Sequence, residues 1–307
     1  MESLLDDGYD SGVEFDDDLF IPLETPDEGY HNNGRLYPAS RRSRHPFPID
    51  EREKERQHRQ FLSYSELFEG KLCLASIKRP QTVFDVRTGT GSWAMQFAVE
   101  YPSSTVYGID AVHMQEEWTP INCEFLIDDL TQRDWYYGLP SPELIHIGGL
   151  CGDRQVLTCL LDGAYRCCLP NGMVEMWDCT VQFLNPTSED ALHRLYREMA
   201  AAFEIDGRSL NLPFLYPTEM ERCGFVNVEE HIYKIPLSLE PPGPAKSVVA
   251  NWADGFEAYG MELLVKHLGK CDHEVFVSCA AARRDLKKGV EGWLEVRVTS
   301  GQKPATP

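Results

Sequence analysis

The chain has 307 residues, a net charge of −20 and 42% hydrophobic residues. This length and this apolar content suffice for one globular core of about 220 residues plus a tail. The acidity speaks against a nucleic-acid-binding surface, since such surfaces use cations to contact phosphates. No apolar run approaches the length of a membrane span, and the N-terminus lacks the pattern of a secretory signal. We therefore expect an intracellular protein, cytoplasmic or nuclear, without membrane or nucleic-acid contacts.

The ten cysteines are scattered over predicted strands and helices, and none is arranged as CxxC. Free thiols in a reducing compartment are the simplest interpretation. We expect no metal site.

Residues 1–30 contain eleven Asp and Glu side chains and no Lys or Arg, so −11 of the net charge of −20 lies there and −9 elsewhere. We expect a disordered acidic tail. Phe15, Leu19 and Phe20 interleave with the acids, and such a mixture can dock as a short helix on a partner protein. A tail that stays solvated is the alternative.

Residues 31–70 are predicted to form a connector followed by a helix. From Ile49 to Phe68 the pattern is helical, and Glu55 and Arg59 are spaced for an i,i+4 ion pair. Apolar residues around Tyr64 give this helix a face to bury. We expect it to lie over the ligand site as a lid.

The stretch Thr82–Trp93 is predicted to be a buried strand, a turn with two glycines and the start of a helix that ends at Glu100. Gly89 and Gly91 let the backbone turn tightly and let a ligand approach without meeting a Cβ atom. The free amide groups and the positive dipole end of the helix point over this turn. The stretch predicts half of a nucleotide-type site.

A second strand, Thr105–Ile109, ends in Asp110, about twenty residues beyond the turn, where doubly wound folds hydrogen-bond a ribose. A dinucleotide and S-adenosylmethionine both fit this geometry. The spacing Gly89-x-Gly91-x-x-Ala94 is close to the dinucleotide fingerprint.

Three aspartates favour S-adenosylmethionine. Asp85 lies inside the first strand, where dinucleotide sites usually have an apolar residue. Asp128 and Asp129 follow a third strand, Cys123–Ile127, and from there a carboxylate can accept a hydrogen bond from an adenine amino group. Ordinary polar residues at strand ends are the alternative interpretation.

Seven segments follow one another in a characteristic order between residue 31 and about 285. They are Asn33-Gly34-Arg35-x-Tyr37, Leu67-Phe68-x-Gly70-Lys71-Leu72, Phe84-Asp85-Val86, Thr88-Gly89-Thr90-Gly91-x-Trp93-Ala94, Gly108-Ile109-Asp110, Ile127-Asp128-Asp129 and Leu144-Ile145-His146-Ile147. This order of motifs resembles the LaeA-type fungal methyltransferases.

The resemblance implies a class I methyltransferase fold, which is α/β with a doubly wound, mostly parallel sheet. It implies S-adenosylmethionine as the cofactor and a small-molecule O or N acceptor in fungal secondary metabolism. Members of the family are pathway enzymes or nuclear regulators that associate with velvet-type proteins. The expected cofactor-binding residues are Asp85, Thr88, Gly89, Gly91, Asp110, Asp128 and Asp129.

Arg87 departs from the family pattern, which has a glycine after the first strand. A long cation here either clashes with the methionine end of the ligand or swings out to pair with a carboxylate. The first outcome would favour a regulatory or catalytically degenerate protein, or one that assists a pathway step without methyl transfer.

The domain is expected to span residues 71–285 and to be followed by a loose tail, 286–307. After an amphipathic helix that ends before Leu169, the expected elements are a strand at Met173–Trp177, a helix at Ser188–Phe203, a strand at Phe225–Tyr233, a long helix at Lys246–Leu268 and a last strand at Glu274–Cys279. We expect the acceptor to bind near Asn185–Pro217, Trp177 and Tyr216.

His146, at the end of the fourth strand, is the predicted catalytic base. A base is needed only where the acceptor must lose a proton, since methyl transfer otherwise depends mainly on proximity and orientation. An ordinary strand histidine that bonds to the backbone is the alternative.

Overall fold

The computed structural model describes residues 29–39, 45–116, 118–128, 131, 135, 138–240 and 243–305. Residues 1–28 of the predicted acidic tail and the predicted ligand Asp129 lie outside this part. Within it, none of the helices combines the length and the apolarity needed to cross a membrane. The same residues contain no group of His, Cys, Asp and Glu side chains arranged to hold a metal ion.

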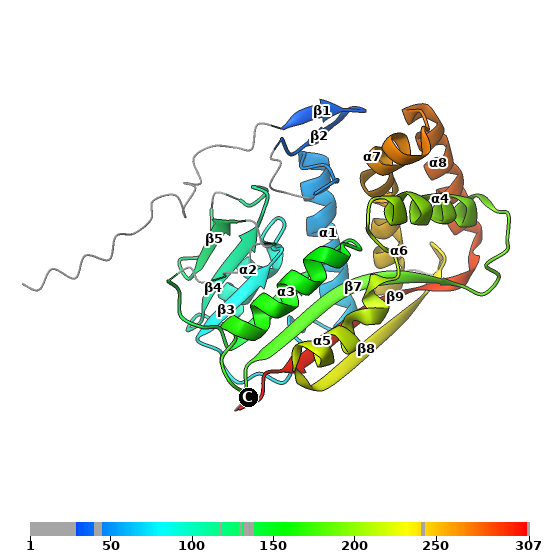
Figure 1. Cartoon of the computed structure of the whole chain (residues 1–307). Coiled ribbons are helices and arrows are strands. Elements are labelled where there is room, and N and C mark those ends of the chain that lie inside the picture. The colour runs from blue at the N-terminus through cyan, green and yellow to red at the C-terminus, as the bar shows by residue number, and fades with distance from the viewer. Residues whose placement is uncertain are drawn as a thin grey trace, which may run out of the picture.

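A seven-stranded sheet with the order β5-β4-β3-β6-β7-β9-β8 forms the centre of the described chain (Figure 1). Its strands are β3 (Thr82–Val86), β4 (Thr105–Asp110), β5 (Cys123–Ile127), β6 (Leu144–Gly148), β7 (Met173–Phe183), β8 (Val226–Leu237) and β9 (Val290–Gln302). Neighbours from β5 to β7 pair in parallel, and β9 pairs antiparallel with β7 and β8. The predicted α/β fold is confirmed.

The chain runs outward from β3 through β4 to β5 and then returns to β6 on the other side of β3. The strand order therefore reverses between β3 and β6. In open α/β sheets, ligands bind at the carboxyl ends of the strands beside such a reversal.

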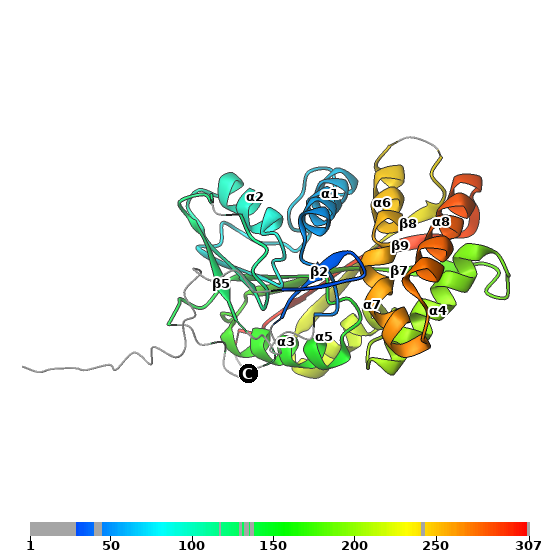
Figure 2. The same ribbon diagram turned by 90° about the horizontal axis from the view of Figure 1, so that it is seen from above.

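Helices cover both faces of the sheet (Figure 2). One face carries α1 (Glu51–Leu67), α2 (Ser92–Glu100) and α6 (Pro244–Asp254), and the other carries α3 (Arg154–Cys167) and α5 (Tyr216–Cys223). The helices α4 (Ala191–Ile205), α7 (Phe256–Leu268) and α8 (Asp272–Lys288) gather at the β7 end, and a short 3₁₀ helix spans Leu212–Leu215. Each face of the sheet has its own hydrophobic cluster, and the α1 face has the larger one.

A hairpin of β1 (Tyr30–Asn32) and β2 (Arg35–Tyr37) precedes α1. Its turn has positive φ at Asn33 (49°) and Gly34 (73°), as a two-residue hairpin turn requires. Arg35 Nε lies 2.6 Å from Asp50 Oδ2, and the other carboxylate oxygen of Asp50 caps the first turn of α1. The hairpin thus fixes the N-terminal end of α1.

The prediction of a loose tail at 286–307 is wrong over β9, which is an inner strand of the sheet. Leu294, Val296 and Val298 are fully buried and alternate with charged residues. The charged residues are themselves paired, since Arg297 Nη1 lies 2.5 Å from Glu295 and Nη2 lies 2.7 Å from Glu230 on β8. Pairing of the charges lets the strand be buried.

Two further predictions in this region are wrong. The expected strand Glu274–Cys279 is the beginning of α8, where Val275, Cys279 and Leu286 recur at helical spacing and are fully buried. The prediction failed because the valines and the phenylalanine around Val275 are residue types that are common in strands. The expected long helix at Lys246–Leu268 is two helices, α6 and α7, which meet at Gly255.

Candidate active site

The turn after β3 is closely packed on both sides. Gly91, the N-cap of α2, has φ 78°, and a Cβ atom there would lie 2.2 Å from Phe125 of β5. Gly89 has φ 56°, and a Cβ atom there would lie 2.5 Å from Gln57 Oε1 of α1. Both glycines have a positive φ that strains other residues, and Gly91 is in addition enclosed by Phe125.

Asp110 holds this turn from the end of β4. Its carboxylate accepts hydrogen bonds from the amide of Gly89 (2.8 Å) and from the amide of Val112 (3.3 Å). Burial raises the pKa of Asp110, and the charge of Arg87 and the backbone donors oppose that rise. The carboxylate lies where the sequence placed a ribose ligand.

Asp85 and His146 face each other across the reversal in strand order, because they are register partners on β3 and β6. Asp85 Oδ1 lies 2.8 Å from His146 Nδ1, and Asp85 Oδ2 accepts a 2.5 Å hydrogen bond from the Thr88 hydroxyl. Asp85 therefore links the glycine turn to the predicted base. Sequence analysis predicted a cofactor role for Asp85 and missed this pairing, which only the strand register reveals.

The His146 imidazole is held by two indoles. It stacks on Trp93 of α2 with centroids 4.0 Å apart and planes at 6°, and it meets Trp177 of β7 edge-on at 4.7 Å. Nε2 is buried and has no hydrogen-bond partner in the described structure. Asp85 fixes one ring nitrogen and leaves the other available.

One cavity of about 240 Å³ brings most of the predicted site residues together. Asp85, Thr88, Gly89, Asp110 and His146 all line it. Gly91 lies in the same turn but not on the cavity wall, and half-buried Asp128 also lies off the wall. The backbone amide of Asp128 donates to the carbonyl oxygen of Asp110 (2.9 Å), so this residue extends the edge of the site.

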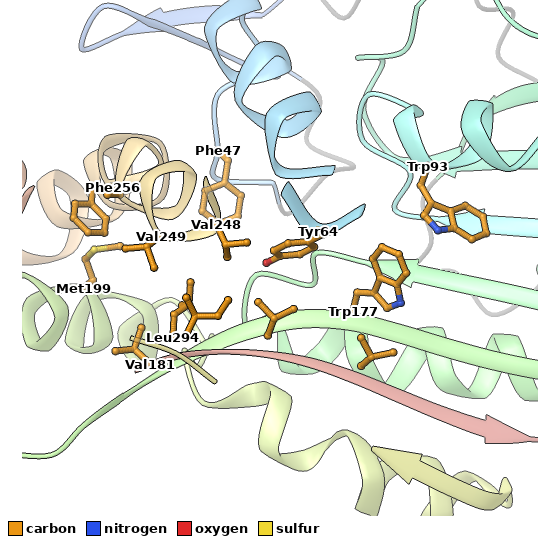
Figure 3. Packing of buried hydrophobic residues seen from close by; sticks show 14 of the residues in the cluster. Phe47, Tyr64, Trp93, Trp177, Val181, Met199, Val248, Val249, Phe256 and Leu294 are labelled. Carbon is orange, nitrogen blue, oxygen red and sulfur yellow. The ribbon is translucent and has the colours of Figure 1, made fainter. Parts of the chain in front are cut away.

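Beyond the glycine turn, the cavity continues into a space with aromatic walls, which we call the aromatic chamber. Figure 3 shows the packing of the buried hydrophobic cluster, to which Phe47, Tyr64, Trp177 and Phe256 of the chamber belong. The residues that define the chamber are Phe47, Tyr64, Trp177, Phe203, Phe256 and Tyr259. Trp177 was expected at the acceptor site and the helix α1 over the ligand site, whereas the contributions of Phe47 and α7 were not recognised from the sequence.

The roof of the cavity contains a buried ion pair within α1. Arg56 donates to both carboxylate oxygens of Glu53, at 2.9 and 2.7 Å, and its guanidinium lies 4.9 Å from the ring centre of Tyr259. Glu53 and Arg56 are only 2% and 4% exposed. This part of α1 covers the cavity, and a lid movement stays a prediction.

Asp178 lies where the glycine turn and the aromatic chamber meet, one residue beyond the register pair of Gly148 and Trp177. Its carboxylate accepts hydrogen bonds from the Tyr216 hydroxyl (2.7 Å) and the amide of Cys179 (2.8 Å). Burial raises its pKa above the ordinary aspartate value. The sequence named Tyr216 but missed Asp178.

Arg87 has a left-handed backbone, with φ 58°. For a residue with a Cβ atom this conformation costs about 1–2 kcal/mol. Its half-buried side chain lines the cavity, and its charge lowers the pKa of both Asp110 and Asp178 relative to burial alone. A glycine would adopt this positive φ without that cost.

The fold is that of class I methyltransferases. The phosphoethanolamine N-methyltransferase 2 of Haemonchus contortus, solved with phosphomonomethylethanolamine and S-adenosylhomocysteine, matches with a TM-score of 0.53 at 13% identity. The match covers 88% of this chain and 62% of that chain, so this chain spans less than two thirds of that protein. No protein-family model matches the sequence.

Curated relatives confirm the resemblance to LaeA-type proteins. The methyltransferase pytC of Aspergillus terreus is 25% identical over 286 residues, covering 89% of this chain and 88% of that protein. The secondary metabolism regulator LAE1 of Cochliobolus heterostrophus is 28% identical over 267 residues, covering 80% and 82%. The protein-methionine methyltransferase laeA of Emericella nidulans is 28% identical over 214 residues, covering 60% and 57%. The relatives thus include both methyltransferases and regulators of secondary metabolism.

Proposed function

We propose that this protein is an S-adenosylmethionine-dependent methyltransferase of fungal secondary metabolism, acting on a small and largely aromatic acceptor. The observation that carries the proposal is the single cavity that joins the glycine turn and Asp110 to the aromatic chamber. A donor held at the first end and an acceptor held at the second would meet beside Asp178 and His146.

The residues at the end of the cavity formed by the glycine turn and Asp110, which we call the sheet end, fit S-adenosylmethionine. Gly89 and Gly91, both at positive φ, form the tight turn beside the cavity, and Asp110 lies at the end of β4 to accept from ribose hydroxyls. Asp128 follows β5 at the adenine end, and Asp129 keeps the same proposed role from outside the described residues. When bound, the cofactor supplies a methyl group on a reactive sulfonium.

The chamber favours an aromatic acceptor, because ring faces and edges of several elements surround it. Aromatic pairs add about 0.5–1.5 kcal/mol beyond burial of their area. The walls also exclude water, which would otherwise separate the two reactants. The chain's main contribution to rate is then to hold the acceptor in line with the transferred group.

We further propose His146 as the base for acceptors that must lose a proton. Asp85 holds Nδ1, so Nε2 is the nitrogen left to take a proton. Replacing His146 by Gln should lower kcat by about 10²–10⁴-fold if it acts as a base. A purely structural histidine would instead lower the stability and leave kcat per folded molecule unchanged.

Calorimetric titration of the full chain with S-adenosylhomocysteine tests the cofactor assignment. We expect micromolar affinity, near about −8 kcal/mol. Incubation with methyl-labelled S-adenosylmethionine and a panel of phenols, aromatic amines and aromatic acids then tests transfer, with mass spectrometry of the product. Absence of any adenosyl-ligand binding by a folded protein would refute the proposed function.

A second candidate function is a LaeA-like regulator, or a degenerate enzyme that assists a pathway step without methyl transfer. It is favoured by Arg87, whose side chain lines the cavity at a position where the family resemblance implies a glycine. The acidic N-terminal tail would then bind a partner protein. Failure of the unmodified protein to bind S-adenosylhomocysteine, with recovery in Arg87→Gly, would support this function.

A further inference from the structure

Arg87 keeps a strained backbone within the cavity. Non-glycine residues held at positive φ cluster at functional sites, where the strain is compensated by what the side chain does. Arg79 offers a comparison, since it also has positive φ (47°) but is exposed and lies away from the cavity. At Arg79 the side chain is solvated, whereas at Arg87 it lines the site.

The side chain of Arg87 has hydrogen-bond donors that are not used within the described structure. Its Nε is buried and has no hydrogen-bond partner, and no ion pair to its guanidinium is found among the described residues. A buried donor without an acceptor is costly, and more so when it carries charge. The guanidinium is therefore suited to a ligand that brings an acceptor into the cavity.

The neighbours of Arg87 do not meet this need. Asp110 accepts from the amides of Gly89 and Val112, and no ion pair joins it to Arg87 in the described structure. Asp178 is committed to the Tyr216 hydroxyl and to a backbone amide.

The other two groups within the electrostatic reach of Arg87 are uncharged near neutral pH. Burial raises the pKa of Cys151 to about 11 and lowers the pKa of His45 to about 3. The charge of Arg87 is thus moderated at a distance and is not paired by contact.

The geometry points to Arg87 as a carboxylate-binding residue, whose guanidinium takes a planar carboxylate between the glycine turn and Asp178. Arginine presents a rigid fork of donors that matches the two oxygens of a carboxylate. A phosphate would bring close to two negative charges beside Asp110 and Asp178, so a carboxylate with one charge fits better.

Two molecules could supply this carboxylate. One is the amino-acid end of S-adenosylmethionine, in which case the inference rests on the proposed function. The other is an acidic aromatic acceptor in the chamber. Both sources use the same chemistry at Arg87, and the cavity reaches it from both ends.

The test compares ligands that differ only in the carboxylate, using the full-length chain and calorimetric titration. S-adenosylhomocysteine is set against 5′-methylthioadenosine, which keeps the adenosyl thioether and lacks the amino acid. In a second arm, 2-naphthoate is set against 2-naphthamide. The proteins are the unmodified chain, Arg87→Gln, Arg87→Lys and the control Arg79→Gln, each checked for folding by circular dichroism.

If the cofactor supplies the carboxylate, Arg87→Gln should weaken S-adenosylhomocysteine about 10–100-fold and methylthioadenosine less than about threefold. If the acceptor supplies it, the same variant should abolish the preference for naphthoate over naphthamide. Arg87→Lys should recover part of either effect, since it keeps the charge but not the fork. Arg79→Gln should change neither.

The inference is overturned if Arg87→Gln alters neither ratio, or if it tightens all four ligands, which would mean that Arg87 only obstructs the cavity. If the unmodified protein binds neither adenosyl ligand but still prefers naphthoate to naphthamide, the proposed function is rejected and carboxylate binding is retained. Absence of binding by all four ligands to the folded, unmodified protein would reject both.

Discussion

The two ends of the cavity differ in how many separate parts of the chain build them. The sheet end comes from one β3–α2–β4 unit, in which Asp85, Gly89 and Asp110 follow each other closely in sequence. The aromatic chamber draws on the segment before α1 and on α1, α4, α7 and β7. The sheet end thus needs one local unit to be formed, whereas the chamber exists only when distant segments have packed together.

This difference predicts that substitutions at the two ends affect different quantities. Phe256→Ala, in the chamber, should have the largest effect and lower the free energy of unfolding by about 3–5 kcal/mol. Phe256 is only 2% exposed and packs edge-on against Trp252 with centroids 4.8 Å apart. Urea denaturation measures the loss, and titration with S-adenosylhomocysteine should give the same affinity for the folded variant.

Phe276→Ala is the matched control, since Phe276 is 40% exposed on α8. It should change the free energy of unfolding by no more than about 0.5 kcal/mol. A Phe256→Ala variant that stays stable but loses the adenosyl ligand would show that the two ends are not independent.

Asp110→Asn, at the sheet end, should lower the affinity for the adenosyl ligand and leave the stability nearly unchanged. It replaces a charged acceptor by a neutral one, so the affinity for S-adenosylhomocysteine should fall about 10–100-fold, or about 1.5–3 kcal/mol. Stability should change little, because burial disfavours the charge that is removed. Calorimetry and urea denaturation of the same sample measure both, with the exposed Asp272→Asn as control. An affinity within about threefold of the unmodified protein would contradict the ribose assignment.

Asp178 lies where the two ends of the cavity meet. Because burial raises its pKa, we expect it to make the free energy of unfolding depend on pH. Its pKa is raised above 3.8, so the folded chain holds the proton more tightly than the unfolded chain. This contribution to stability is fully present below pH 3.8 and is lost as pH rises through the raised pKa. Relative to the unmodified protein, Asp178→Asn should therefore gain stability as pH rises over this window.

Urea denaturation from pH 4 upward, about one unit at a time, measures this difference, and Asp272→Asn should show none. A difference that shrinks with rising pH would mean that the native state favours the Asp178 carboxylate. Tyr216 and the Cys179 amide would then outweigh burial.

The smallest effect concerns His45, whose pKa is lowered to about 3 by burial first and by Arg87 and Arg208 second. Removing one cation in Arg87→Gln should raise the pKa of His45 by less than about one unit. NMR titration of the imidazole signals measures it, and Arg79→Gln should leave His45 unchanged. An unaltered His45 in Arg87→Gln would place the Arg87 charge farther from this end of the cavity.

The sheet end was predictable because its signals are local. A strand, two glycines with positive φ and an aspartate at the next strand end fix one another within a single unit. Arg87 was recognised as a departure for the same reason, although its left-handed backbone was not foreseen. The pairing of Asp85 with His146 depends on which strand follows β3 in the sheet and on their register, and periodicity contains neither.

The chamber and β9 were harder to predict for a different physical reason. Phe47 and Phe256 lie far apart in sequence, and nothing local distinguishes an aromatic wall of a cavity from ordinary core. In β9, Glu295 and Arg297 are buried because Arg297 pairs with Glu295 on the same strand and with Glu230 on β8. Since β8 lies far away in sequence, local patterning does not show that these charges can be buried.

The position of β9 between β7 and β8 also sets an order of events during synthesis. β8 joins the sheet only through β9, and β9 follows it in the chain after three helices. While the ribosome still holds β9, β8 has no partner strand and β7 has an open edge, both of which can pair with other chains. The sheet is therefore completed only when β9 has emerged, and until then the edge of β7 is open to pairing with other chains.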